Sequence, residues 1–536
     1  MAKPLELSLG AILWVAAGAL FVAIRLAGVL SIPVGGVELA HLAGAWQANV
    51  GNDDGRFVPT MFQGLTAWSF EFTRSEEPMR WLAFIASATV PLSLYRVRGL
   101  FTEAGALLAL VLLAFDPVSI LLGSAAWAGA FDITVILWIL VLTQRETVER
   151  YDLGLAAFVA TIAGPLVLPF VGAIAAVRLV RQEYPSREQL IPAAIGVVAG
   201  ILFASIGFGF GWEGITIPPL QAFIDGFEAE WSTETTGYLA VLYSAPILLA
   251  GVAAAVHRAY ANWRDQEWPL ADITLLAWGA IALAWVVAAG PSNDPTPLAA
   301  AALPFAIIVG RELPQVFAEL SRVEWRYAGW GLAALLAAAF VTEAFVVDWA
   351  RVDRPGGNGD KLIVAGLLVA VLACVGLLAS NRRTAAALFV PVGVLLALPM
   401  LSGASNVTFG GPNEPLPSPI TTIQGAELRD IALQAREERG GLIVIHSNFR
   451  EEMTWPFRDS GDIVLATSVG ADATIVIWPA SEPAPEGFSV LDGQWGFLEI
   501  RHAPDGGFLD YLRWLSNRNS LRNTFVPVAV YQRTTE

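Results

Sequence analysis

A small set of ionisable residues stands in or beside long apolar runs of this sequence, where a charge costs a few kcal/mol in a membrane. Within the apolar runs lie Arg25, Asp116, Asp132 and Glu343, while Glu38 and His41 open a polar segment one helical turn apart. A carboxylate in such a place could take a proton as a general base, and a nearby arginine could hold a phosphate. An alternative is that these residues lie at a membrane boundary and extend their polar ends to water without chemistry.

Other motifs with chemical potential give weaker signals. The four histidines, at positions 41, 257, 446 and 502, have no metal-ligand spacing, so no metal site is predicted from them. Asn52-Asp53-Asp54-Gly55 could supply hard oxygen ligands to a divalent cation, which leaves that cofactor open, but it is also an ordinary turn sequence, which we favour. Cys374 is the lone cysteine and excludes a disulfide within the chain.

The residues named first must be positioned by a helical membrane domain. The chain is 55% hydrophobic and only 15% charged, and apolar runs of about 18 to 22 residues recur over its first 400 residues, the length that crosses a ~30 Å hydrocarbon layer. We expect about 13 spans within residues 1–401. They lie near 8–30, 82–95, 104–122, 128–143, 152–163, 165–178, 190–210, 238–256, 270–289, 298–310, 327–347, 361–379 and 384–401. The runs 152–163, 165–178 and 298–310 could instead be re-entrant.

Loop charge predicts how these spans are oriented. Alternate loops are rich in arginine, for example at Arg96, Arg98 and Arg258, and short cytoplasmic loops carry such residues. The other loops are acidic, and the first of them, 31–81, is long enough to have a function of its own. We therefore expect a multi-pass protein of the cell membrane with a cytoplasmic N-terminus and an outer C-terminal domain.

The last part of the chain has the composition of a small α/β domain. A linker rich in Gly, Pro, Asn and Ser is expected over 402–422, followed by a domain over 423–536. It is predicted to contain helices at 423–438 and 508–518 and strands at 442–446, 463–466, 474–478, 497–501 and 526–532. The net charge of −16 argues against a nucleic-acid partner.

Several short stretches match motifs of one enzyme superfamily in part. They are Val37-Glu38 at the start of the first outer loop, Pro59 to Gly64 with Gln63 where a histidine is usual, Ser75 to Arg80, Leu121 to Trp138 with Asp132, Ala289 to Pro295 with Asp294, and Trp455 to Asp459 with Arg458. The layout and these stretches resemble the GT-C superfamily of membrane glycosyltransferases, which includes protein mannosyltransferases and oligosaccharyltransferases. The nearest resemblance is to the flippase-associated glycosyltransferases of archaea and bacteria, which also carry an outer C-terminal domain.

The resemblance implies transfer of a sugar from a polyprenyl-phosphate carrier to a glycan or protein acceptor at the outer face of the membrane. In that scheme Glu38 is the general base, Asp132 orients acceptor or water, and Arg56 or Arg74 faces the phosphate. The remaining candidate substrate-binding residues are His41, Gln63, Asp116, Asp294, Trp455 and Arg458.

This sequence also departs from the superfamily pattern. Val37 replaces the usual leading aspartate, Trp127, Ala128 and Gly129 stand where arginines are usual, and the basic residue near Asp294 is missing. The outward cations that remain are Arg25, Arg56, Arg74 and Arg80.

Two other classes of function stay open. The lost motif positions favour a non-catalytic relative that binds a lipid-linked glycan or scaffolds a partner. A transporter is the third class, but it would place its polar residues at mid-membrane between paired broken helices. The break at Gly164-Pro165 fits a transporter, whereas the outer position of the charged residues does not.

Overall fold

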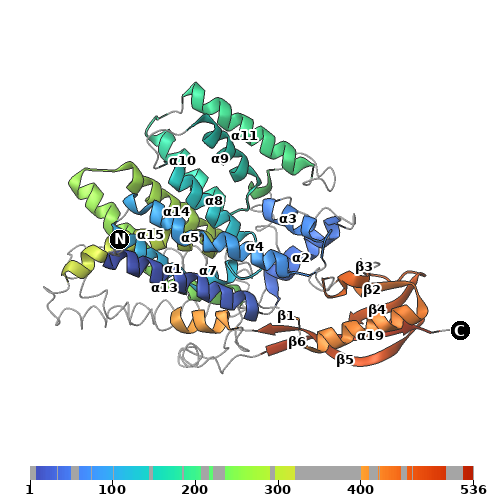
Figure 1. The fold of residues 1–536 in the computed structure, drawn as a ribbon. Helices are drawn as coiled ribbons and strands as arrows, with labels where there is room; N and C mark the ends of the chain where they lie inside the picture. The colour runs from blue at the N-terminus through green and yellow to red at the C-terminus, as the bar shows by residue number, and fades with distance from the viewer. Residues whose placement is uncertain are drawn as a thin grey trace, which may run out of the picture.

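The protein is mostly helical, with a mixed β-sheet at one end of a helix bundle (Figure 1). A computed structural model describes residues 8–32, 34–49, 60–73, 75–100, 102–143, 149–183, 186–206, 217–220, 236–289, 296–319, 400–409, 420–421, 423–447, 455–460, 463–501 and 523–534. The predicted spans 327–347 and 361–379, most of 384–401 and the predicted helix 508–518 lie outside these residues.

The described helices begin and end close to the predicted apolar runs. They are α1 (Leu9–Ser31), α2 (Gly36–Asn49), α3 (Met61–Ser69), α4 (Glu77–Ala88), α5 (Val90–Arg96), α6 (Glu103–Phe115), α7 (Pro117–Leu122), α8 (Gly129–Thr143), α9 (Arg150–Ile162), α10 (Val167–Val180), α11 (Arg187–Ser205), α13 (Thr236–Asp265), α14 (Leu270–Ala289) and α15 (Thr296–Glu319). A short 3-10 helix, η1 (Arg98–Leu100), follows α5. The segment 31–81, predicted to be the first outer loop, contains α2 and α3.

Two predicted spans are each divided into two helices at a proline. The run 82–95 is broken between α4 and α5, where Pro91 occupies the first turn of α5. The run 104–122 is broken at Asp116, where Pro117 begins α7. Proline is tolerated in the first turn of a helix but not in its interior, because it lacks the N–H and its ring clashes with the preceding turn.

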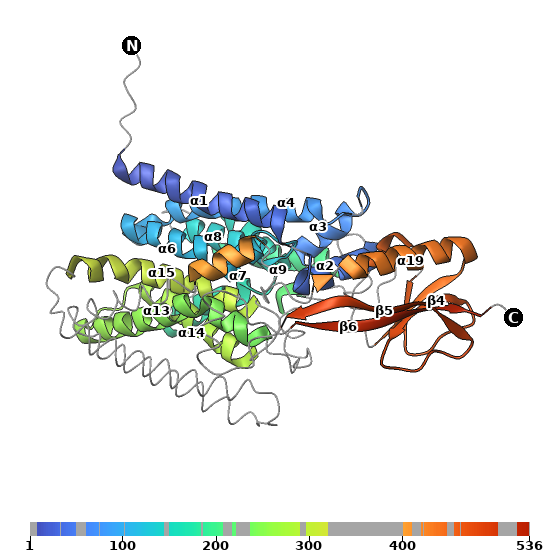
Figure 2. The same ribbon diagram turned by 90° about the horizontal axis from the view of Figure 1, so that it is seen from below.

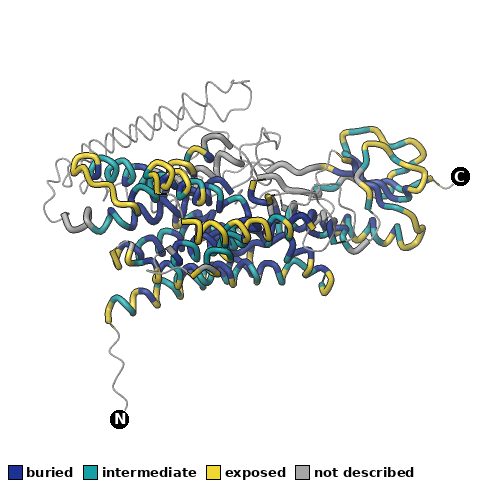
Figure 3. Tube along the Cα trace, turned by 90° about the horizontal axis from the view of Figure 1, so that it is seen from above, coloured by how far each residue is buried: buried dark blue, intermediate teal, exposed yellow. Residues whose placement is uncertain are grey.

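Three of the described helices are long and apolar enough to cross a membrane. They are Leu9–Ser31, Arg187–Ser205 and the part Thr296–Pro314 of α15. Within the most apolar window of α15, 89% of the residues are buried, compared with 22% in α11. The helix α15 is therefore central in the bundle, and α11 is peripheral and presents its apolar side chains outward. Figure 3 shows buried residues concentrated inside the bundle and the sheet, with exposed residues around them.

Contacts between helices identify one end of the bundle, which we call the basic end. There Trp14 of α1 packs edge-on against Tyr95 of α5, with ring centroids 5.4 Å apart. The backbones of Gly105 in α6 and Gly310 in α15 come close together at this end, next to Arg311. Arg311 and Arg258 both pair with buried Asp272, at 2.5 and 2.6 Å. Arg258 and Arg311, which belong to two of the loops predicted to be cytoplasmic, thus lie at the same end.

The opposite end of α1 adjoins the sheet. Ile32, directly after α1, accepts a hydrogen bond from Arg80 of α4 at 2.8 Å. Since Trp14 and Val29 are 15 residues apart on one helix, the two ends are separated by about 22 Å. In Figures 1 and 2 the sheet lies beside α2 at this end, which we call the sheet end.

The sheet has six strands in the order β1-β5-β6-β4-β2-β3. Their bounds are β1 (Ile420–Thr421), β2 (Leu442–His446), β3 (Ile463–Ala466), β4 (Ala473–Pro479), β5 (Phe488–Arg501) and β6 (Asn523–Arg533). Strands β3, β2 and β4 are parallel, and β4, β6, β5 and β1 pair antiparallel. The predicted strands are confirmed in place, although β5 begins nine residues before the predicted 497–501.

One helix covers a face of this sheet. Helix α19 (Ile423–Arg439) buries Leu428 and Ala432 against Ile443, Ile475 and other alternate residues of the strands. The helix ends at Gly440 and Gly441, whose backbones have φ of 69° and 85°, a region that favours glycine. The predicted helix 423–438 is therefore confirmed.

The segment expected as a linker contains regular structure at both of its ends. Residues 400–408 are helical, and β1 at 420–421 pairs with β5. A high content of Gly, Pro, Asn and Ser shows where the chain leaves the bundle, but it did not predict that β1 hydrogen-bonds to the sheet. Residues 410–419 and 422 are not among those described.

The close approach of α6 and α15 gives a test of this packing. Replacing Gly105 by alanine would place a methyl group against the Gly310 carbonyl, and we expect a loss of stability of roughly 1–3 kcal/mol, typical of overpacking. Gly172→Ala is the matched control, because its added Cβ would meet Ile281 at 3.9 Å, an ordinary contact. Thermal unfolding in detergent, followed by circular dichroism, should show a lower midpoint for Gly105→Ala alone. Equal midpoints for both variants would contradict this packing.

Candidate active site

A buried ion pair between Glu38 and Arg80 is the centre of the candidate site. Arg80 Nε donates to Glu38 Oε1 and Arg80 Nη2 to Glu38 Oε2, both at 2.7 Å. The two residues are only 4% and 7% exposed. A two-pronged contact of this kind matches the planar guanidinium to the carboxylate and is among the stronger hydrogen-bonded pairs.

Backbone groups complete this pair. Glu38 Oε1 also accepts a hydrogen bond from the Ala126 N–H at 2.7 Å, and Arg80 Nη1 donates to the carbonyl of Ile32. Ala126 belongs to the segment 123–128 between α7 and α8. The pair therefore joins α2, α4, the end of α1 and this segment at a single point.

Asp132 joins a second set of elements. Its Oδ1 accepts from the Gly164 N–H at 2.7 Å and its Oδ2 from the Leu166 N–H at 3.2 Å, so it binds the turn between α9 and α10. A side chain at position 164 would collide with this carboxylate, which explains the glycine. Each oxygen retains one further lone pair that could accept a hydrogen bond from a hydroxyl or water.

Arg25 and Asp116 bind the break between α6 and α7. Arg25 donates to the carbonyls of Leu113 and Ala114 at the end of α6, at 2.7 and 3.3 Å. Asp116 Oδ2 accepts from the backbone N–H and the hydroxyl of Ser119, and Oδ1 from Ser244 of α13. These groups are buried, and the cavity beside Arg25 holds about 10 Å³, which is room for one water molecule at most. Among the described residues, there is thus no room for a substrate around Arg25.

Two polar residues of the outer loop lie near the ion pair. His41, one turn after Glu38 on α2, packs against Phe62 of α3 with ring centroids 5.3 Å apart. Gln63 is buried on the same face of α3 and approaches Gly44 of α2. Burial lowers the pKa of His41 from 6.5 to about 4, so the ring is neutral near pH 7.

The C-terminal part of the chain contacts these loop helices directly. Trp455, in the 3-10 helix η5 (Trp455–Ser460), is 3% exposed and lies 5.2 Å from Phe70 between ring centroids. Arg458 stacks over the Trp455 ring and pairs with Glu76 at 3.8 Å, just before α4. The motif Trp455 to Asp459 thus connects the sheet to the helices that carry Glu38 and Arg80.

Most of the predicted site residues lie at the sheet end of the bundle. The Ser124 hydroxyl donates to the Arg25 carbonyl, and the Ala126 N–H donates to Glu38. The same segment leads into α8, which carries Asp132. These groups therefore lie at a similar height along the bundle. Among the described residues, no hydrogen bond or ion pair joins Asp132 or Asp116 to Glu38. The predicted residues Arg56, Arg74, Asp294 and Glu343, and the pair Asp53-Asp54, are outside the described residues.

Arg80 is the residue whose role the sequence did not assign. It was one of four outward cations, and nothing in its spacing from Glu38, 42 positions away, indicates a contact. The available signal was physical, since an arginine at the start of an apolar helix needs an acid near it. Within the described ranges, no three side chains of His, Cys, Asp or Glu are grouped to hold a metal ion.

Comparisons with known proteins give a limited result. No family model matches the chain, and no curated protein matches it significantly. Among solved structures, ArnT from Cupriavidus metallidurans bound to undecaprenyl phosphate is 14% identical with a TM-score of 0.49 over 98% of each chain. The same protein in the apo state gives 14% identity and a TM-score of 0.46 over 97% of each chain.

The half-buried His41 predicts a pH effect on stability. The Nε2 atom of His41 is buried without a hydrogen-bond partner among the described residues, so folding excludes a proton that the unfolded chain binds below about pH 6.5. The His41 contribution is complete above that pH and is lost as pH falls toward 4. We expect the unfolding temperature of His41→Phe to fall less than that of the wild type between pH 7 and 4.5. Parallel pH profiles would contradict this.

Trp455 is expected to dominate the contact between the sheet and the loop helices. Trp455→Ala removes a core side chain and should cost about 3–5 kcal/mol. Glu76→Gln is the control, because it removes only a partly exposed ion pair and should cost at most about 1 kcal/mol. Differential scanning fluorimetry in detergent would compare them, and equal costs would show that Trp455 is not an anchor.

Proposed function

We propose that the chain is a GT-C-like membrane glycosyltransferase that takes a sugar from a polyprenyl-phosphate donor at the sheet end of the bundle, and that this end faces outward. The observation that carries the proposal is the Glu38–Arg80 pair, which places a candidate base and a cation for a phosphate side by side. The partial motifs around Glu38, Asp132 and Trp455 support the same class of protein.

Arg80 supplies the cation whose usual positions are lost in this sequence. Its guanidinium neutralises Glu38 through two hydrogen bonds. Arg80 is therefore the described arginine in direct contact with the proposed base. The phosphodiester of the donor carries one negative charge, as a carboxylate does, and its two free oxygens bind the same planar donors. We infer that an arriving donor phosphate competes with Glu38 for Arg80 and so frees the carboxylate.

The freed carboxylate then has a defined task. Glu38 accepts the proton of the acceptor hydroxyl, whose oxygen forms a bond to the anomeric carbon of the sugar. The bond between that carbon and the phosphate oxygen breaks, and polyprenyl phosphate leaves with its negative charge next to Arg80. Asp132 keeps its two backbone hydrogen bonds and directs the remaining lone pairs toward the acceptor or water. Arg56 and Arg74 remain further candidates for the phosphate.

A second candidate is a non-catalytic relative that binds a lipid-linked glycan. One observation favours it: both oxygens of Glu38 already accept strong hydrogen bonds from Arg80 and Ala126. If the pair never opens, the acid only holds the helices together. Polyprenyl-phosphate-linked sugar would then bind without turnover.

The test measures labelled sugar incorporated into membranes from polyprenyl-phosphate-linked sugar donors. We expect Glu38→Gln to reduce incorporation at least about 100-fold, the usual contribution of a general base. Glu103→Gln, at the basic end of the bundle, is the matched control and should retain wild-type incorporation.

A charge-balanced double variant separates chemistry from packing. Glu38→Gln combined with Arg80→Gln leaves no unpaired buried charge, so it should fold better than either single variant. Under the proposal it remains inactive. Recovery of incorporation in this variant would remove Glu38 and Arg80 from the mechanism, and donor binding without incorporation by the wild type would select the non-catalytic candidate.

A further inference from the structure

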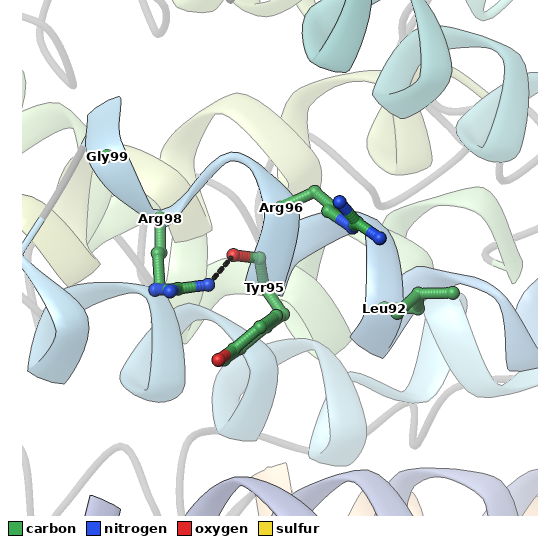
Figure 4. A pocket seen from close by; sticks show the side chains of 5 residues that line it. All are labelled: Leu92, Tyr95, Arg96, Arg98 and Gly99. Atoms are coloured by element: carbon green, nitrogen blue, oxygen red, sulfur yellow. Dashed lines mark hydrogen bonds between the residues drawn. The ribbon is translucent and has the colours of Figure 1, made fainter. Parts of the chain in front are cut away.

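The basic end of the bundle carries a pocket that the proposed reaction does not use. It is lined by Leu92, Tyr95, Arg96, Arg98 and Gly99, where α5 passes into η1, and has a volume of about 630 Å³ (Figure 4). The Glu38–Arg80 pair lies at the opposite end of α1, so the two sites are independent. We propose that this pocket binds the phosphodiester headgroup of an anionic phospholipid.

Among the described residues, no carboxylate pairs with either arginine of the pocket. Arg96 is exposed and pairs with no side chain that the structure describes. Arg98 donates one hydrogen bond to the Tyr95 carbonyl at 2.9 Å and stacks over the Tyr95 ring at 3.8 Å, which leaves its other N–H groups available. The next acidic residue along the chain, Glu103, lies against Gly10 of α1 instead. Each guanidinium presents planar N–H groups, which bind phosphate oxygens well.

The surroundings of the pocket match a membrane boundary. Leu92 is 62% and Tyr95 38% exposed, and Leu13 and Val15 of α1, on either side of Trp14, are also exposed. Tyrosine is typical of the interface, where its ring contacts lipid and its hydroxyl contacts water. Apolar side chains therefore adjoin the arginines, as the headgroup and upper acyl chains of one lipid would require. A free anion would not need the apolar part.

Arg98 is held in place by contacts that reach into the bundle. Trp14 packs edge-on against the Tyr95 ring. The Tyr95 carbonyl in turn accepts a hydrogen bond from the Arg98 guanidinium, which Figure 4 shows. Gly99 leaves the pocket open, since a Cβ at this position would meet no atom within 4 Å. The pocket is therefore preformed and can be closed by substitution without disturbing the backbone.

Native mass spectrometry of the full-length protein in detergent tests this proposal, with dioleoyl phosphatidylglycerol and dioleoyl phosphatidylcholine as probes. We expect the anionic lipid to bind about tenfold tighter, the order given by two arginines near a membrane surface. Arg96→Gln with Arg98→Gln, or Gly99→Asp alone, should reduce this preference below about twofold. Arg187→Gln, which changes an exposed arginine at the start of α11, should leave it intact.

Three results would overturn the proposal. In the first, the wild type alone shows no preference between the two lipids. The double variant could retain the tenfold preference while eluting as a folded protein. Alternatively, millimolar inorganic phosphate could displace the lipid completely, which would make this a site for a small anion.

Discussion

Charges buried among apolar helices need partners, and in this protein the broken ends of helices provide most of them. Asp116 binds the N–H at the start of α7, Asp132 binds the turn before α10, and Glu38 binds the Ala126 N–H before α8. Arg25 binds the carbonyls that end α6. A helix interrupted inside a bundle leaves N–H and C=O groups unsatisfied, and a buried ion leaves lone pairs or N–H groups unsatisfied. The backbone groups at a helix break and the polar atoms of a buried ion hydrogen-bond to each other. The helix breaks and the buried charges therefore occur together.

This pairing determines which ion could take part in chemistry. Asp132, Asp116 and Arg25 are each bound to backbone, so releasing any of them would leave a buried backbone group without a partner. The Glu38–Arg80 pair differs, because two of its five hydrogen bonds join two oppositely charged side chains. A competing anion could take over Arg80 without exposing backbone, apart from the one bond to Ala126. The exchange in the proposed mechanism therefore costs least at this pair.

The sequence predicted helix positions well because hydropathy records burial in lipid or in the bundle, and α14 begins and ends at the predicted residues 270 and 289. The sequence-based prediction was wrong at helix breaks and did not identify contacts between residues far apart in the chain. Pro91 and Pro117 were present in the sequence, yet the runs around them remained apolar and were read as single spans. In the site, the sequence selected Glu38 and Asp132 but not their partners, because Arg80 is 42 positions from Glu38 and the Gly164 N–H carries no side-chain signal. Contacts of this length depend on how α2, α4 and α9 pack.

The two ends of the bundle differ in how they satisfy charge, and this difference bears on what each end can bind. At the sheet end, the buried ions Glu38, Arg80 and Asp132 all have hydrogen-bond partners, so a ligand must displace an existing partner. At the basic end, Arg311 and Arg258 both pair with Asp272, while the exposed Arg96 and the half-buried Arg98 line a pocket with Leu92 and Tyr95. A ligand there meets charge that is already free. Binding at the sheet end is therefore an exchange that can discriminate between anions, whereas binding at the basic end is an addition whose selectivity comes from charge and from the adjoining apolar surface.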